Sequence, residues 1–210
     1  MLSGKRVCVL VSGGGTNLQA LLDAQRDGNL GGGRIVGVIS SRDGVFALER
    51  AARAGVPTAV VERKSFASAE EFDAALLAAL KAFDAELVVL AGFLSILGKS
   101  VVAAYADRII NIHPALIPSF CGKGYYGLRV HEAALAYGVK VTGATVHFVN
   151  EIPDGGAIIL QKAVSVEEGD TPEVLQKRVM EQAEWELLPR AVALFCEGRL
   201  SVDGHICHIQ

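Results

Sequence analysis

The sequence has no apolar run long enough to cross a membrane, because glycine, serine or a charged residue interrupts every candidate. It also has no excess of positive charge: the net charge is −3 and the isoelectric point about 6.0, which argues against nucleic-acid binding. Residues 1–6 lead directly into an apolar stretch without a small-residue cleavage site, so we expect no signal peptide. These absences together favour a cytoplasmic protein with neither a membrane nor a nucleic acid as partner.

Cysteine is scarce, and its four residues form no C-x-x-C pair. This scatter favours a reducing compartment over a disulfide framework. His205 and His208 flank Cys207, but no second pair of ligands is available to complete a tetrahedral site, so we expect no metal. With 210 residues, of which 51% are hydrophobic, the chain can bury a full core without such crosslinks.

Glycine, by contrast, is abundant, with 23 residues that gather where strands are expected to end. Short apolar runs alternate with segments of helical periodicity, which is typical of a doubly wound α/β fold with a mostly parallel sheet and helices on both faces. The expected strands cover residues 7–11, 35–40, 58–61, 87–90 and 109–112. Helices are expected after the first glycine cluster, over residues 45–54, and from a cap at Ser68 to Phe83.

The pattern changes after Pro114. A helix is predicted around residues 130–137, followed by an antiparallel pair of long strands at 141–149 and 157–164. Thr171 is the predicted cap of a long final helix, with Pro172 at its first position and its end near Cys196. Residues 199–209 alternate weakly and are predicted to form a terminal hairpin, which completes a single domain over residues 1–210.

Three consecutive glycines, Gly13, Gly14 and Gly15, lie between the first strand and the first helix. Glycine allows a sharp turn and a close approach of a ligand to the backbone. The free N–H groups and the dipole at the start of the helix favour an anion, and Thr16 and Asn17 add side-chain donors. The sequence therefore predicts a phosphate-binding loop.

Two other interpretations of this loop stay open. A G-x-G-x-x-G dinucleotide motif would need glycine where Leu18 stands, but Arg42 after the second strand suits a 2′-phosphate, which keeps an NADP-dependent reductase as a remote alternative. The other interpretation is a tight turn without a ligand.

A second group of polar residues begins at the end of the fifth strand. Asn111 and His113 alternate onto one side, at the edge where open α/β sheets bind ligands. His147 lies within an apolar strand, and Asp154 opens a turn between two strands. Each residue also has a structural interpretation, as a core histidine or a turn aspartate, and the spacing permits their convergence without proving it.

Four segments together resemble the glycinamide ribonucleotide formyltransferase family: SGGGTNLQA at 12–20, INIHPAL at 110–116, GATVHFV at 143–149 and DGG at 154–156. The resemblance extends from about residue 5 to residue 199. It implies transfer of a formyl group from the co-substrate 10-formyltetrahydrofolate to the amine of glycinamide ribonucleotide, in purine biosynthesis.

The resemblance also implies roles for individual residues. Asn111 and His113 would donate hydrogen bonds to the oxyanion that forms when the amine attacks the formyl carbon. Asp154 would raise the pKa of His113 and help to remove the amine proton, with His147 as the fourth catalytic residue. Residues 13–17 would hold the phosphate, and Glu184 a ribose hydroxyl.

The pterin of the folate would lie in an apolar slot between two segments. Its expected residues are Leu94, Ser95, Ile96, Leu97, Val149, Asn150, Glu151 and Ile152. By the same resemblance, residues 1–110 form a Rossmann-like phosphate-binding half and residues 111–210 a catalytic and folate-binding half. The partners would be the two small-molecule substrates, and the state a monomer or a homodimer.

The sequence departs from the family near the glutamate tail of the folate. Family members often have arginine at the positions of Ala69 and Ser95. We therefore expect folate affinity to depend weakly on the anionic tail, unless Arg63, Lys64 or Lys99 compensates.

Further differences lie in the loop after His113. Cys121 stands where some members have proline or lysine, and it is either an inert thiol or one whose modification inhibits. Residues 122–130 form a longer insertion, either a lid or a packed loop. The nearest rival functions are a formyltetrahydrofolate hydrolase, which resembles this family but is expected to carry an extra N-terminal domain, and a methionyl-tRNA formyltransferase, which needs a C-terminal tRNA-binding domain.

Overall fold

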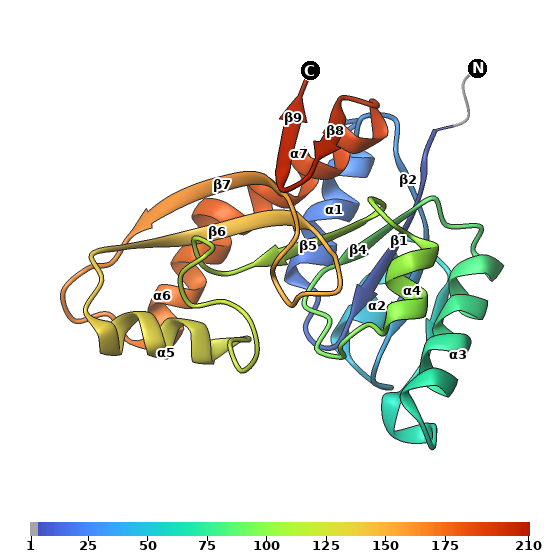
Figure 1. The fold of residues 1–210 in the computed structure, drawn as a ribbon, viewed down its shortest axis with the longest axis horizontal. Coiled ribbons are helices and arrows are strands. Elements are labelled where there is room, and N and C mark those ends of the chain that lie inside the picture. Colours follow the sequence, from blue (N-terminus) through green and yellow to red (C-terminus); the bar gives the residue numbers. More distant parts are fainter. Residues whose placement is uncertain (1–3) are drawn as a thin grey trace.

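The computed structural model describes residues 4–210, and a nine-stranded sheet organises its fold (Figure 1). The strand order is β3-β2-β1-β4-β5-β6-β7-β9-β8. The strands are β1 (Arg6–Val11), β2 (Arg34–Ser40), β3 (Thr58–Val60), β4 (Leu87–Leu90), β5 (Ile109–His113), β6 (Val141–Phe148), β7 (Ile158–Ser165), β8 (Leu200–Asp203) and β9 (Ile206–Ile209). The expected α/β class is confirmed. The signal-peptide prediction concerns in part residues 1–3, which lie outside the described residues.

Helices cover both faces of this sheet. They are α1 (Thr16–Arg26), α2 (Phe46–Arg53), α3 (Ala69–Ala82), α4 (Lys99–Ala104), α5 (Leu128–Tyr137), α6 (Pro172–Val179) and α7 (Trp185–Cys196), with a 3₁₀ turn η1 (Arg63–Ser65) and a π-helical segment η2 (Met180–Glu184). The predicted caps are present, since Ser68 Oγ accepts from the Glu71 N–H at 3.1 Å and Thr171 Oγ1 from the Val174 N–H at 3.3 Å. Within residues 4–210, no helix is both long and apolar enough to span a membrane.

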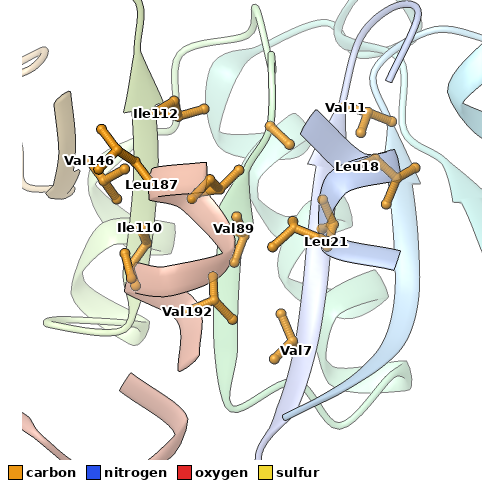
Figure 2. Close-up of a cluster of buried hydrophobic side chains, with 14 of the residues drawn as sticks. Val7, Val11, Leu18, Leu21, Val89, Ile110, Ile112, Val146, Leu187 and Val192 are labelled. Carbon is orange, nitrogen blue, oxygen red and sulfur yellow. The ribbon is translucent and has the colours of Figure 1, made fainter. Parts of the chain in front are cut away.

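The parallel strands are buried on both faces, and this explains why they read as continuous apolar runs. In β1, Val7, Val9 and Val11 pack on one face with residues of α1 and α7, whereas Cys8 and Leu10 pack on the other face with residues of α3. Figure 2 shows the first of these two cores, in which side chains from α1 and α7 meet those of β1, β4 and β5. The centre of the sheet is therefore packed on both faces, next to the site described below.

The strand order reverses at β1, which pairs with β2 on one side and with β4 on the other. Ligands of open α/β sheets bind at such a reversal, outside the carboxyl ends of the strands. The loop after β1 carries the three glycines, and the loop after β4 carries the segment from Leu94 to Leu97. The two loops are joined directly, because the Leu94 N–H donates to Ser12 Oγ at 2.8 Å.

The second half of the chain extends the sheet with antiparallel strands, as predicted. β6 pairs with β5 and with β7, both antiparallel, and the hairpin of β8 and β9 joins the edge through β9. In Figure 1, β6 and β7 extend beyond the parallel strands toward α5 and α6. The register places Asn111 opposite His147 and His113 opposite Thr145, so the polar residues of β5 and β6 share one region of the sheet.

Two predictions of secondary structure need correction. The helix α4 was not expected, because six residues are too few to show a periodic pattern; it is set by Asp73 of α3, which accepts from the Gly98 N–H at 3.1 Å and from Ser100 Oγ at 2.9 Å. The final helix was expected to be uninterrupted, but the π-helical turn η2 divides it. Such turns occur frequently at functional sites, and this one contains Glu184.

Candidate active site

The glycine loop has the geometry of an anion site. Gly15 takes the left-handed conformation (φ 72°) as the cap of α1, and a Cβ there would lie 2.7 Å from that of Ala47, so only glycine fits. Added Cβ atoms at Gly13 and Gly14 would meet nothing within 4 Å, which leaves their backbone open. No side chain caps α1, so its first N–H groups are free to bind an anion.

The far side of this loop is closed by Glu184. Its carboxylate is buried and accepts a hydrogen bond from Asn17 Nδ2 at 2.6 Å. Burial raises the pKa of Glu184 to about 7, although the bond from Asn17 opposes this rise. Asn17 Oδ1 is also buried without a partner among the described residues. The loop and the π-helical segment thus meet at a pair of polar groups with unused hydrogen-bonding capacity.

Asn111 and His147 form the first contact of the predicted catalytic group. Asn111 Nδ2 lies 3.1 Å from His147 Nε2, and His147 Nδ1 lies 2.7 Å from the Phe148 carbonyl. Because that carbonyl can only accept, His147 carries its proton on Nδ1, and Nε2 accepts from the Asn111 amide. The second N–H of the same amide is left for another acceptor. His147 therefore orients Asn111.

His113 and Asp154 form the second contact. Nδ1 of His113 lies 3.6 Å from Oδ2 of Asp154, which is slightly longer than a hydrogen bond, and Nε2 of His113 lies 2.8 Å from the Phe120 carbonyl. Oδ1 of Asp154 is 3.5 Å from His147 Nε2. The structure therefore brings all four residues predicted to be catalytic into one cluster, although Asp154 lies in a loop 41 residues beyond His113 (154 minus 113).

The carboxyl group of Asp154 is held in its charged form. Burial works against ionisation, but the rings of His147 and His113, when protonated, and the Gly122 N–H, which donates to Oδ2 at 2.8 Å, together outweigh it and place the pKa below its ordinary value. Asp154 also has a positive φ of 56°, a conformation that aspartate tolerates better than most residues. A carboxylate that is charged, half-buried and in an unusual backbone conformation is typical of a functional position.

Asp154 raises the pKa of His113, as predicted, but the net pKa of His113 is nevertheless lowered. Burial is the largest influence and lowers the pKa of His113 below 6.5; Asp154 and the Phe120 carbonyl raise it by less. The sequence could indicate the neighbouring carboxylate but not the depth of the pocket. His113 is consequently neutral near pH 7, with Nε2 protonated toward Phe120 and the lone pair of Nδ1 facing Asp154.

Sequence reasoning missed three groups that lie near His113 or Asp154. Two are backbone groups of the loop after His113, the Phe120 carbonyl and the Gly122 N–H, and backbone groups leave no signature in a sequence. The third is His131 of α5, which is fully buried, with no partner for either ring nitrogen among the described residues. Burial, followed by the proximity of His113, lowers the pKa of His131 to about 4.

The thiol of Cys121 lies in the same loop. Burial and the charge of Asp154 both raise its pKa, which opposes formation of the reactive thiolate. The loop is held to His113 by the Phe120 carbonyl and to Asp154 by the Gly122 N–H.

The two segments predicted to contact the pterin lie next to each other. Lys99 Nζ is 3.4 Å from Glu151 Oε2, and Val149 packs in the same cluster as Leu97. Both segments expose large apolar side chains: Leu94 is 49% exposed, Ile96 77% and Ile152 62%. These apolar side chains lie beside the point of the sheet where the strand order reverses, which is also where the predicted catalytic residues meet.

The cations that could replace the missing arginines are partly engaged. Lys99 pairs with Glu151, Lys64 lies 3.3 Å from Glu62, and Arg63 donates to the Phe66 carbonyl at 3.1 Å. A cavity of about 430 Å³ adjoins them. Its lining consists of Ser41, Arg42, Asp43, Glu62, Arg63, Lys64, Leu94 and Ser95, so acids offset most of its positive charge.

This arrangement defines a class of protein: an α/β sheet whose strand reversal combines an anion-binding loop with an amide, an imidazole and a carboxylate. Such a set can stabilise an oxyanion and transfer a proton without a side-chain nucleophile. Residues 5–192 match the family model described as formyl transferase. The chain therefore belongs to the formyl transferase family.

Individual relatives narrow this assignment to one branch. A phosphoribosylglycinamide formyltransferase of Haemophilus influenzae is 38% identical over 206 residues, covering 98% of this chain and 94% of that protein. The crystal structure of glycinamide ribonucleotide transformylase 1 from Symbiobacterium toebii superposes with a TM-score of 0.93 at 44% identity, covering 100% of this chain and 95% of that chain. The human trifunctional purine biosynthetic protein adenosine-3 is 44% identical over 98% of this chain, which spans 20% of its length.

Proposed function

We propose that the protein transfers the formyl group of 10-formyltetrahydrofolate to the amine of glycinamide ribonucleotide, in the synthesis of purines. The observation that carries this proposal is the cluster of Asn111, His113, His147 and Asp154, with contacts of 3.1–3.6 Å, at the strand reversal beside the glycine loop. The named activities of the relatives support the same reaction. The expected division into halves at residue 110 is part of the proposal.

In this reaction the substrate amine attacks the formyl carbon, and the carbonyl oxygen becomes an oxyanion. The free N–H of Asn111 donates to that oxygen, held in place by His147, which acts as a positioning residue. A donor aimed at an oxyanion typically contributes about 10²–10³ in rate. Collapse of the intermediate breaks the bond between the formyl carbon and N10 of the folate.

The proton moves from the attacking amine to N10. Neutral His113 is suited to accept it, since Nδ1 carries the lone pair, and Asp154 stabilises the imidazolium that results. His113 then returns the proton to the leaving nitrogen, so that the enzyme ends as it began. In the resting enzyme His113 is thus a base, and it becomes an acid only after the first transfer.

Substrate binding is assigned to three groups around this cluster. The N–H groups of residues 13–17, with the side chains of Thr16 and Asn17, hold the phosphate, and Glu184 accepts from a ribose hydroxyl. The exposed apolar side chains of residues 94–97, together with residues 149–152, hold the pterin. None of these roles needs a metal.

The test measures formyl transfer in the presence and in the absence of glycinamide ribonucleotide. The quantity monitored is the release of tetrahydrofolate. We expect release to depend on the ribonucleotide and to yield its formylated form in equal amount. Release at the same rate without it would identify a formyltetrahydrofolate hydrolase instead. Turnover of NADPH would support the remote reductase alternative and contradict the proposal.

A further inference from the structure

A cavity of about 660 Å³ lies outside the proposed active site, between α1 and α7, which pack side by side (Figure 1). Its volume falls within the range of small-molecule sites, roughly 300–1,000 Å³. The lining is Thr16, Gln19, Ala20, Asp23, Ala24, Asn29, Arg50, Trp185, Glu186, Pro189, Arg190 and Ala193. Only Thr16 belongs also to the proposed phosphate loop.

The floor of the cavity is made of small or flat apolar side chains. These are Ala20 and Ala24 of α1 and Pro189 and Ala193 of α7. Trp185 stands at one side with 37% of its surface exposed. An exposed tryptophan together with small apolar side chains in one cavity suits a planar ring, which can stack on the indole.

The charges of the cavity are unbalanced toward the positive, although two acids and two arginines line it. Glu186 is paired with Lys162, and Asp23 lies 2.9 Å from Arg26. Arg50, by contrast, donates among the described residues only to neutral oxygens, those of Gly14 and Gln19, each at 2.9 Å, and lies over the Phe46 ring, 4.7 Å from its centre.

The second guanidinium, that of Arg190, is exposed and has neither a hydrogen bond nor an ion pair with any residue from 4 to 210. Two uncompensated guanidiniums in one cavity favour an anionic group, and phosphate in particular, since their planar forks bind it well.

We propose that this cavity is a second small-molecule site, which takes a nucleoside monophosphate. The ring stacks on Trp185 over the alanine floor, and the phosphate lies between Arg50 and Arg190. The cavity adjoins the glycine loop through Thr16 and through Arg50, which donates to the Gly14 carbonyl, but the rest of its lining belongs neither to residues 13–17 nor to the catalytic cluster.

Trp185 is the chain's single tryptophan, so its fluorescence reports directly on the cavity. Titration with adenosine 5′-monophosphate should quench it saturably. Adenosine lacks the phosphate, and ribose 5-phosphate lacks the adenine base. Each should bind at least about tenfold more weakly, as expected for the loss of one charge-assisted contact or of the stacked base.

Two variants locate the binding. Arg190→Ala removes the unpaired guanidinium, and Ala20→Leu fills the floor; each should weaken nucleotide binding by at least about tenfold. The matched control is Arg53→Ala, on α2 but outside the cavity and paired with Glu49 at 3.2 Å, which should bind as the unaltered protein does. Absence of saturable quenching, or equal affinity in all three variants, would overturn the proposal. Neither result bears on formyl transfer.

Discussion

At the scale of a single side chain, Asp154 makes contacts that a turn alone does not require. Its carboxylate approaches two histidines and accepts from a backbone N–H, yet an ordinary turn would need none of these. A turn residue and a catalytic residue therefore differ in what their removal does.

We predict that Asp154→Asn lowers kcat by about 10²–10⁴, the usual contribution of acid–base catalysis. Binding of glycinamide ribonucleotide, measured by calorimetry, should change little, because Asp154 contacts His113, His147 and Gly122 and none of residues 13–17. Asp203→Asn, an exposed aspartate of β8, is the control and should retain full activity. Full activity of the Asp154 variant would reduce this residue to a turn.

A second prediction concerns the proton on His113. Since burial lowers its pKa more than Asp154 raises it, the C2–H resonance of His113 should titrate at a pH below 6.5. In Asp154→Asn one of the raising influences is lost, so the midpoint should move further down. A midpoint above 6.5 in the unaltered protein would restore the imidazolium as the resting form and contradict the proposed order of proton transfers.

Among the elements, the loop between β5 and α5 is the one whose backbone completes the site. It presents a carbonyl to His113 and an N–H to Asp154, and it holds Cys121 between them.

We predict slow alkylation of Cys121 by iodoacetamide at pH 8, because burial and Asp154 both raise its pKa. The rate, followed by mass spectrometry of the peptide, should increase in Asp154→Asn. A rate as high as that of free cysteine would show a reactive thiol.

The segments near the folate tail support a fourth prediction. The arginines expected at Ala69 and Ser95 are absent, and Lys64, Lys99 and Arg63 already contact protein groups. Removal of the glutamate from the folate should therefore raise its Kd by less than about tenfold, which is less than one charge-assisted contact in a buried site. A larger loss would show that the cavity lined by Arg42 and Arg63 binds the tail.

Much of this arrangement could be predicted, because strand periodicity and glycine position follow local rules. The order of elements, the caps at Ser68 and Thr171 and the antiparallel pair after Pro114 all depend on neighbours in the sequence. The π-helical turn at Glu184 and the sign of the pKa shift of His113 depend on burial by distant segments, and no local pattern records that burial.

Across the protein as a whole, two buried titratable groups oppose each other in their effect on stability. His131, with a pKa of about 4, binds a proton less readily in the folded than in the unfolded state. Its effect is therefore to lower the free energy of unfolding as the pH falls from 6.5 toward 4. Glu184, with a pKa of about 7, binds a proton more readily in the folded than in the unfolded state. Its effect is therefore to lower the free energy of unfolding as the pH rises from 4.5 through 7. The free energy of unfolding should therefore vary little with pH between 4.5 and 6.5 on account of this pair.

Glu184→Gln separates the two effects, since it keeps an acceptor for Asn17 and removes the titration. We predict that the variant gains stability relative to the unaltered protein as the pH rises from 5 to 7.5, by about 1–3 kcal/mol, at about 1.4 kcal/mol for each unit of pKa shift. Urea unfolding at the two pH values measures the difference, with Glu181→Gln, an exposed neighbour in the same π-helical turn, as control. An equal pH dependence in all three proteins would show that Glu184 is ionised in the fold, and Glu184 would then meet the ribose as a carboxylate throughout the neutral range.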